Sequence, residues 1–242
     1  MNESNNSTEK RNFDCDLLLI GHAVEDTIFD GDKEPLTQWG GIYNVARQFK
    51  KLSVYRTFCG YKEPKIIIEP TAYGRAYIKI DRKTCSKEVE VDLNLKARRI
   101  WGHDIHAMWT HVCYINKLDG WQFTSSGIRS ADVCGTGILN SSFMNLLDYV
   151  FVSDEDFDVE QESSFAENTI FIAHTPDYVR LWKGGIKEFE YKVPNKLKTC
   201  NPLGAGDSFA AGIIHYILFV NDNIEEAVKF AVEKTHDYLL SN

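Results

Sequence analysis

Nine residues near the C-terminal end of the chain constrain its fold most strongly. The stretch Asn201-Pro202-Leu203-Gly204-Ala205-Gly206-Asp207-Ser208-Phe209 places two glycines and a carboxylate directly before an apolar run that extends to Val220. Proline ends the preceding element, glycines permit a tight turn, and the apolar run predicts a buried helix that begins at this turn. The first turn of a helix presents unpaired amide N–H groups and partial positive charge. The stretch therefore predicts a site for phosphate oxygens, with Asp207 able to take a proton from a hydroxyl.

Two segments near the N-terminus combine predicted secondary structure with polar residues and glycines. Leu17-Leu18-Leu19-Ile20-Gly21 predicts a buried parallel strand leading into a loop, and Asp26 follows in that loop. A carboxylate there can accept hydrogen bonds from two neighbouring hydroxyls. Trp39-Gly40-Gly41-Ile42-Tyr43-Asn44-Val45-Ala46 opens a predicted helix from about residue 41 to 51. Alone, a glycine pair is commonly a plain loop and an aspartate is commonly a solvated loop residue. A role in ligand binding therefore depends on finding both segments together with the C-terminal stretch.

Together these segments resemble the signatures of the ribokinase-like sugar kinases, the PfkB family. The C-terminal stretch resembles (D/N)-(T/P)-x-G-(A/S)-G-D-x-F, and the N-terminal one resembles G-G-x-x-x-N-x-A. The resemblance implies a catalytic base at Asp207 and an anion hole for the transferring phosphate at Gly204, Ala205 and Gly206. It implies substrate-binding residues at Asp26, Gly40, Gly41 and Asn44. It also implies ATP and Mg²⁺ as cofactors and a sugar or a nucleoside as the small-molecule substrate.

The same resemblance implies a three-layer α/β/α fold with a mostly parallel central sheet and a small β-sheet lid. From residue 110 onward, short apolar runs alternate with helical patterns, which is typical of a parallel sheet covered by helices. The strands predicted from these runs are 111–115, 131–134, 149–152, 169–173 and 179–182, after an earlier strand at 54–58.

The domain organisation follows from the same patterns. Residues 1–13 are polar and without apolar periodicity, so we expect a disordered tail followed by one α/β domain over 14–242. Segments 65–69, 73–81 and 87–93 are β-rich and partly alternate apolar and polar side chains. We expect these strands, from about 65 to 93, to form the lid rather than an edge ribbon without that role. The lid is also the expected surface for a homodimer.

The chain departs from the family pattern where phosphates and nucleotide bind. The family has a strand followed by N-x-x-E, which helps to organise magnesium, whereas this chain has Ser153 and Asp156. Asp156 keeps a carboxylate that could hold a water on a hard cation. His174 and Pro176 replace a glycine-containing nucleotide loop by a stiffer, bulkier turn. With the chain ending soon after its second C-terminal helix, we expect a minimal or altered nucleotide pocket.

Charge and cysteine content exclude several classes of function. The net charge of -8 and the pI near 5.4 oppose general nucleic-acid binding, which needs basic residues to displace counterions. No apolar run approaches the roughly 18–20 residues of a membrane helix. The six cysteines form no C-x-x-C pair, and no signal peptide precedes them, so we expect reduced thiols in a cytoplasmic protein.

Other constellations are weak. His103-Asp104-Ile105-His106, with His111 and Cys113 nearby, contains good zinc ligands, but the spacing fits no common zinc motif and neighbouring tryptophans favour packing. We therefore predict no directly bound metal there. The chain has no Walker G-x-x-x-x-G-K-S/T and no G-x-S-x-G elbow, which excludes a P-loop kinase and the simplest hydrolase. Among aromatic residues that could stack on a substrate ring, we single out Tyr77.

Two hypotheses of different class follow. The first is a magnesium-dependent kinase that transfers the γ-phosphate of ATP to a hydroxyl of a small sugar-like or nucleoside substrate, with Asp207 as general base. The second is a catalytically degenerate sugar- or nucleotide-binding regulatory protein on the same scaffold. The altered segments at 153–156 and 173–176 motivate the second, and the intact Asp207 favours the first. Many family members respond to K⁺ near the start of the signature, and Asn201-Pro202 in place of Asp-Thr leaves that response open.

Overall fold

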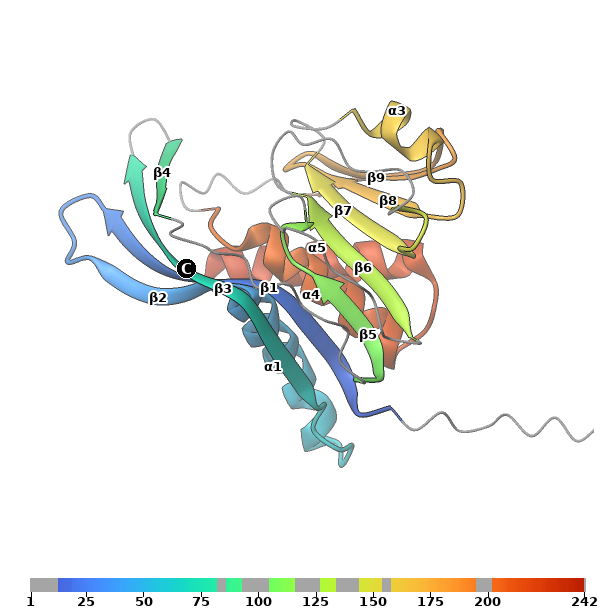
Figure 1. Ribbon diagram of the computed structural model, residues 1–242, viewed down its shortest axis with the longest axis horizontal. Helices are drawn as coiled ribbons and strands as arrows, with labels where there is room; N and C mark the ends of the chain where they lie inside the picture. The colour runs from blue at the N-terminus through green and yellow to red at the C-terminus, as the bar shows by residue number, and fades with distance from the viewer. Residues whose placement is uncertain are drawn as a thin grey trace, which may run out of the picture.

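The protein is built on a large mixed sheet with helices packed against it (Figure 1). The structure is a computed structural model and describes residues 13–81, 86–92, 105–115, 127–133, 144–153, 158–194 and 202–241. The strands are β1 (Cys15–Asp30), β2 (Leu36–Gly41), β3 (Ile66–Asp81), β4 (Ser86–Asp92), β5 (Ala107–Val112), β6 (Ile128–Val133), β7 (Tyr149–Ser153), β8 (Ile170–His174), β9 (Tyr178–Lys183) and β10 (Ile186–Lys192). The helices are α1 (Ile42–Phe58), α3 (Val159–Ser164), α4 (Ala205–Phe219) and α5 (Ile224–Leu240).

Parallel pairing dominates the centre of the sheet. The strand order is β10-β9-β8-β7-β6-β5-β1-β3-β4, with β2 paired to β1. The neighbours from β3 to β8 in this order are all parallel. The strands β9 and β10 add antiparallel pairs at one edge, and β2 and β4 pair antiparallel with β1 and β3. The parallel order brings the carboxyl ends of β5, β6, β7 and β8 to one edge, next to the point where β1 leaves β5 after Ile20. Ligands bind at this edge in open α/β sheets.

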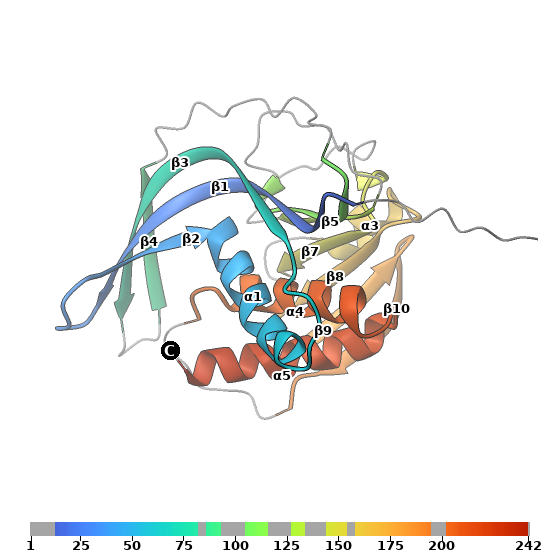
Figure 2. The ribbon, with the colours of Figure 1, turned by 90° about the horizontal axis from the view of Figure 1, so that it is seen from below.

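Apolar side chains on both faces of the central strands form the core. The helices α1, α4 and α5 lie on one face of the sheet (Figure 2). On that face Leu17 and Leu19 pack with Phe49 of α1 and Ile214 of α4. Alternate residues of the same strand, including Leu18, enter a second cluster that contains Val159 of α3. This two-sided burial explains why β1 begins as a continuous apolar run.

The strands expected to form a lid, here called the lid by their position, continue the central sheet. The strands β1 and β3 pair in parallel throughout, with a register shift between Gly21 and His22 where they leave the core. Their outer halves recruit β2 and β4, which gives the four-stranded lid visible beside α1 (Figure 2). The inner lid face buries Ile28, Ala76, Ile78 and Ile80, and Leu203 from the turn before α4 packs against this cluster. The lid therefore touches the predicted phosphate site.

The structure confirms the predicted fold class and corrects several local predictions. The strand predicted at 54–58 is wrong, because α1 continues to Phe58. The apolar residues there lie on a helix that is already anchored in the core, so tertiary packing overrides β-propensity. Asp26 lies inside β1 rather than in a loop, and β10 was not predicted. Residues 1–12 of the expected tail lie outside the described residues. No helix in the described part of the chain is long and apolar enough to cross a membrane.

Candidate active site

Asp207 lies in the first turn of α4, where the glycine-rich turn meets the helix. Gly204 is the N-cap and has φ of 73°, a left-handed conformation that favours glycine. The Asp207 side chain is buried, with 7% of the residue exposed. The helix start is held from the far end of α5, because the Tyr238 hydroxyl donates to the Leu203 carbonyl at 2.8 Å. The structure thus confirms that a buried helix begins at these glycines.

Asn44 reaches Asp207 across 163 residues of sequence. Its Nδ2 donates to Asp207 Oδ2 at 3.0 Å. Its Oδ1 accepts from Arg47 Nη1 at 3.1 Å, and Arg47 Nη2 also donates to the Trp39 carbonyl at 2.8 Å. Because Arg47 can only donate, these bonds fix the orientation of the Asn44 amide. The first turn of α1 therefore positions a donor on the predicted catalytic base.

Asp26 occupies the inner side of the lid root, against β2. A Cβ atom built on Gly40 would overlap Asp26 Oδ2, so a larger residue there would have to displace this carboxylate. Gly41 has φ of 58°, and a Cβ atom there would lie 2.4 Å from the His22 carbonyl oxygen. The predicted glycine pair thus allows β2 to approach β1 closely. Asp26 is also near enough to Asp207 for its charge to affect that carboxyl.

The backbone amides of the turn are not equivalent. The Ala205 N–H donates to the Pro202 carbonyl at 3.1 Å, so this amide is already engaged. Ser208 N–H donates to the Gly204 carbonyl at 2.8 Å. Among the described residues, the N–H groups of Gly204, Gly206 and Asp207 have no hydrogen-bond acceptor, and those of Gly206 and Asp207 belong to α4. These two amides, in the first turn of α4, are the donors best suited to an anion.

Burial shapes the acid–base properties of the two carboxylates. Burial raises the pKa of Asp207 to about 7, the charge of Asp132 adds to this rise, and the hydrogen bond from Asn44 opposes it. Burial also raises the pKa of Asp26 to about 6, against a lowering by Arg47. A carboxylate with a pKa near neutrality is a stronger base than an exposed one and is still ionised in an appreciable fraction at pH 7.

Several residues at the site were not singled out from the sequence for the roles that their positions suggest. Tyr114 has φ of 57°, and its hydroxyl lies 3.5 Å from Asp207 Oδ1. It is the one non-glycine residue with positive φ in the described part of the chain. Asp132, near the end of β6, was not singled out at all, because a lone aspartate within a short predicted strand carries no local signal. Only the parallel pairing of β5 with β6 brings it close to Asp207.

The carboxyl ends of β7 and β8 place two more polar side chains beside the turn. Ser153 and His174 are neighbours in register on these parallel strands. His174 is partly buried, and its ring packs on Phe209 with centroids 5.2 Å apart. Its Cε1 and Nε2 atoms lie 3.7 and 4.0 Å from the position of a Cβ on Gly206. The imidazole is therefore adjacent to the predicted anion site. Asp156 and Asn201 lie outside the described residues.

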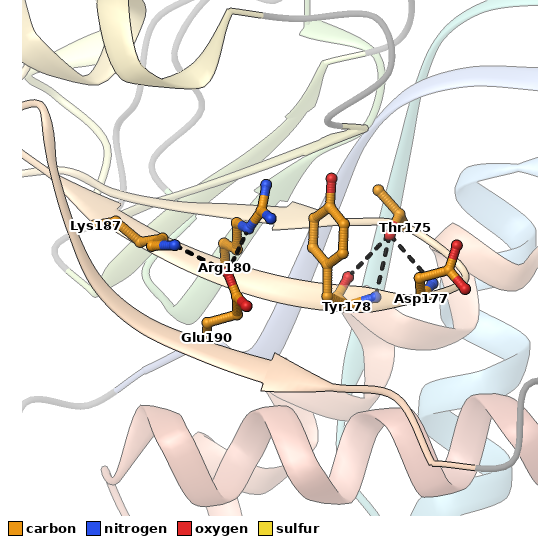
Figure 3. Close-up of polar contacts among 6 residues, drawn as sticks. All are labelled: Thr175, Asp177, Tyr178, Arg180, Lys187 and Glu190. Atoms are coloured by element: carbon orange, nitrogen blue, oxygen red, sulfur yellow. Dashed lines mark hydrogen bonds and ion pairs between the residues drawn. The ribbon is translucent and has the colours of Figure 1, made fainter.

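The turn after His174 is short and held by one hydroxyl (Figure 3). Thr175 Oγ1 accepts from the backbone N–H groups of Asp177 and Tyr178 at 3.2 and 3.1 Å and donates to the Tyr178 carbonyl at 3.3 Å. Glu190 then joins β9 to β10 by accepting from Arg180 and Lys187 at 2.7 and 2.9 Å. The stiff turn predicted from His174 and Pro176 is thus tied down at its centre.

Tyr77 does not face this site. It pairs with Thr27, whereas Asp26 pairs with Ala76, and successive residues of a strand point to opposite faces. Tyr77 is 41% exposed on the side of the lid away from the buried Ala76 and Ile78. The prediction that Tyr77 stacks on a substrate ring is therefore wrong, because strand alternation places it on the outer face.

The architecture is that of the ribokinase-like fold. The structure is similar to ribokinase from Thermotoga maritima, with a TM-score of 0.69 and 17% identity over 93% of each chain. It is similar to a nucleoside kinase from Methanocaldococcus jannaschii, with a TM-score of 0.60 and 12% identity over 95% of this chain and 93% of the other. A pyrophosphate-dependent kinase of the ribokinase family, complexed with a pyrophosphate analogue and myo-inositol, gives 0.63 and 18% over 93% and 95%. No protein-family model and no curated protein sequence matches the chain.

Proposed function

We propose that this protein is a kinase that transfers the γ-phosphate of ATP to a hydroxyl of a small sugar-like or nucleoside substrate, with Asp207 as the general base. The observation that carries the proposal is the environment of Asp207. It combines a buried carboxyl with a pKa of about 7, a fixed amide donor from Asn44, and two partnerless backbone N–H groups in the same helical turn. The likeness to sugar and nucleoside kinases of the same fold supports the class of reaction.

The roles of the side chains follow from their positions. Asp207 takes the proton of the substrate hydroxyl while the hydroxyl oxygen attacks the γ-phosphorus of ATP. The bond between that phosphorus and the oxygen of the departing ADP breaks in the same step. The amides of Gly206 and Asp207 stabilise the negative charge on the transferred group. Asp26 accepts hydrogen bonds from other substrate hydroxyls, and its place on the lid root would orient the substrate toward α4. Most of the rate would come from positioning and charge stabilisation.

The residues present fit a phosphate donor and leave the cation less well defined. The left-handed Gly204 and the free amides beyond it form a cradle that a phosphoryl group can occupy, and ATP would supply that group. For Mg²⁺, Ser153 offers a hard oxygen ligand, and we propose Asp156 as its carboxylate partner. The proposal places the substrate under the lid, with neither nucleic acid nor membrane as a partner, in a cytoplasmic setting.

The test is ADP release from ATP and Mg²⁺ across a panel of sugars, sugar phosphates and nucleosides. We expect a substrate-dependent signal that falls by about 10²–10⁴-fold in Asp207→Asn, because the base is lost while the substrate contacts stay. Asp222→Asn, an exposed aspartate at the far end of α4, is the matched control and should keep full activity. Turnover retained in Asp207→Asn would overturn the assignment of the base.

Further arms of the panel separate the remaining alternatives. Pyrophosphate replaces ATP in one arm, because one structural neighbour is a pyrophosphate-dependent kinase. K⁺ replaces Na⁺ in another. If no arm shows substrate-dependent turnover and panel compounds still raise the melting temperature, the degenerate binding protein would be favoured. The substitution of Ser153 and His174 for the residues usual in the family is the observation that favours this second function.

A further inference from the structure

We infer that His111, Cys113 and Asp132 form a binding site for a divalent cation of the zinc class, next to Asp207. The inference is separate from the proposed magnesium region at Ser153 and Asp156, and it does not depend on kinase activity. Sequence spacing alone gave no zinc motif, because the third ligand lies 19 residues beyond Cys113 and belongs to another strand.

The three side chains converge from two neighbouring parallel strands. His111 lies in β5 and pairs with Ser130 of β6, and the next residue, Val112, pairs with Ala131. Asp132 follows Ala131 in β6. Cys113 follows the last residue of β5, and its backbone N–H is bonded to the Ile20 carbonyl at 2.8 Å. The ligand atoms of all three lie within 4.8 Å of one another. Hydrogen bonding of the strands holds this arrangement without any ion.

The separations suit a tetrahedral shell after a small contraction. His111 Nε2 and Asp132 Oδ2 are 3.2 Å apart. Two ligands at about 2.0 Å from a tetrahedral ion lie about 3.3 Å apart, so this pair needs almost no movement. A thiolate sulfur binds zinc at about 2.3 Å. Two ligand atoms separated by the full 4.8 Å would therefore have to approach each other by about 1 Å. A mixed sulfur, nitrogen and oxygen set is typical of zinc and unsuited to Mg²⁺.

The second nitrogen of His111 is already supported. Ser130 Oγ lies 2.8 Å from His111 Nδ1 and accepts from Trp109 Nε1 at 2.7 Å. A hydroxyl has two lone pairs, so Ser130 can accept from both rings. With the proton on Nδ1, the lone pair of Nε2 is left for the cation. Support of this kind from a hydrogen-bond acceptor is general for histidines that bind metals.

Cys113 is the observation that a simple polar network does not explain. A chain of hydrogen bonds from Trp109 through Ser130 and His111 to Asp132 would be complete without any ion. Cys113, however, is a fully buried free thiol with no hydrogen-bond partner in the described part of the chain, and its sulfur lies within the same cluster. Binding would replace the thiol proton by the cation and release that proton to solvent. Asp132, with a side chain 14% exposed, opens the cluster to solvent.

Cobalt titration of untagged protein under reducing conditions tests the site. Co²⁺ bound to a thiolate gives an intense near-ultraviolet charge-transfer band that nitrogen and oxygen ligands do not give. We expect a saturable band at one equivalent in wild type, displaced by Zn²⁺ and absent in Cys113→Ala. Cys15→Ala removes another buried free thiol of the same sheet and should keep the band. Ser130→Ala should bind about 10–100-fold more weakly, since it lacks the support on Nδ1.

The readout is optical, so an inactive or differently active protein leaves it unchanged. If Cys113→Ala fails to fold, as judged by circular dichroism, His111→Gln and Asp132→Asn replace it and should each lose saturable binding. A wild-type titration without the band, or a band that persists in folded Cys113→Ala, would overturn the inference and leave the hydrogen-bonded chain as the complete account.

Discussion

At the residue scale, the properties of Asp207 come from its burial more than from any single contact. The Oδ2 atom of the carboxyl accepts a hydrogen bond from Asn44, and the Oδ1 atom lies near the Tyr114 hydroxyl. The neighbouring negative charges of Asp132 and Asp26 both raise its pKa, as burial does. Ionisation of a buried carboxyl like that of Asp207 lowers the folding stability of the protein. Shifted pKa values of this kind are common at functional sites.

This cost predicts a pH-dependent gain in stability for Asp207→Asn. Burial raises the pKa of Asp207 from 3.8 in the unfolded chain to about 7 in the folded protein. The folded state therefore binds the proton more tightly, and the contribution of Asp207 to stability falls as pH rises from about 3.8 to about 7. We expect the variant to be more stable than wild type at pH 8, by at most about 4 kcal/mol. The gain should be smaller at pH 5.

Urea unfolding at both pH values measures this difference. Asp222→Asn controls for the general effect of removing one carboxylate from an acidic protein. An equal gain for Asp207→Asn at pH 5 and pH 8 would show that the carboxyl does not titrate in this range.

His174 gives a second prediction at this scale. Burial lowers the pKa of His174, so at pH 7 its imidazole is neutral and can donate one N–H. We expect His174→Ala to lower kcat by about 10²-fold with little change in the KM of the acceptor, as for loss of one donor to a developing negative charge. His174→Gln keeps a donor and should recover part of the rate. A purely packing role, through Phe209, would instead lower the melting temperature of both variants and spare kcat.

At the element scale, the start of α4 depends on its packing against α5. A Cβ atom on Gly212 would stand 2.8 Å from the Ala231 Cα, so the two helices approach closely through small residues. Tyr238 at the far end of α5 holds the Leu203 carbonyl. The same helix that fills the core therefore sets the position of the glycine turn, and a change at either contact should reach Asp207.

Gly204→Ala tests how far this turn tolerates a side chain. The new Cβ would meet Tyr238 Oη at 2.7 Å and would occupy a left-handed conformation at φ of 73°. Gly31→Ala is a matched control, because Gly31 has φ of 62° and open space around it. We expect Gly31→Ala to cost about 1 kcal/mol in unfolding free energy from the backbone alone and to keep activity. Gly204→Ala should cost more and lose most of its turnover, and equal behaviour of the two variants would contradict a steric role for Tyr238.

At the scale of the whole molecule, two long strands join the sheet to the lid. Since β1 and β3 stay paired from the core into the lid, the proposed substrate-binding residue Asp26 and the buried lid residue Ile78 belong to the same hydrogen-bonded sheet as the core. Leu203 contacts the lid cluster from the other side of the site. Movement of the lid would therefore displace both Asp26 and the turn before α4.

The outer lid face leads to a prediction about assembly. It carries exposed aromatic residues, including Trp39 and Tyr73 at 45% and 63% exposure, whose rings lie 6.4 Å apart. We propose that this face pairs with a second copy of the chain, since exposed aromatic clusters mark interaction surfaces. We expect sedimentation velocity to show a dimer that Tyr73→Glu converts to a monomer. Tyr61→Glu, at an exposed tyrosine beyond α1, should leave the dimer intact, and a wild-type monomer at all concentrations would contradict the proposal.

Much of the fold followed from local patterns, and so did the centre of the candidate site. The turn and helix at Gly204 to Phe209, the buried strand at Leu17 and the glycine pair at residue 40 are each defined by neighbours along the chain, and the structure has all three. Local patterns failed where packing decides. The apolar residues after Leu52 continue a helix because α1 is anchored in the core, and Asp26 is drawn into a strand by pairing on both sides.

Tertiary structure alone decided which polar groups meet. Asn44 and Asp207 are 163 residues apart, and His111, Cys113 and Asp132 come from two strands that the sequence does not connect by any motif. The physical reason is that chain-local preferences specify where a helix or strand begins. Strand order and helix packing then specify which ends lie together, and how much water remains between them. By itself the sequence determined most of the elements and the glycine turn before α4, whereas the packing of the sheet and helices, which removes water, determined the pKa of Asp207.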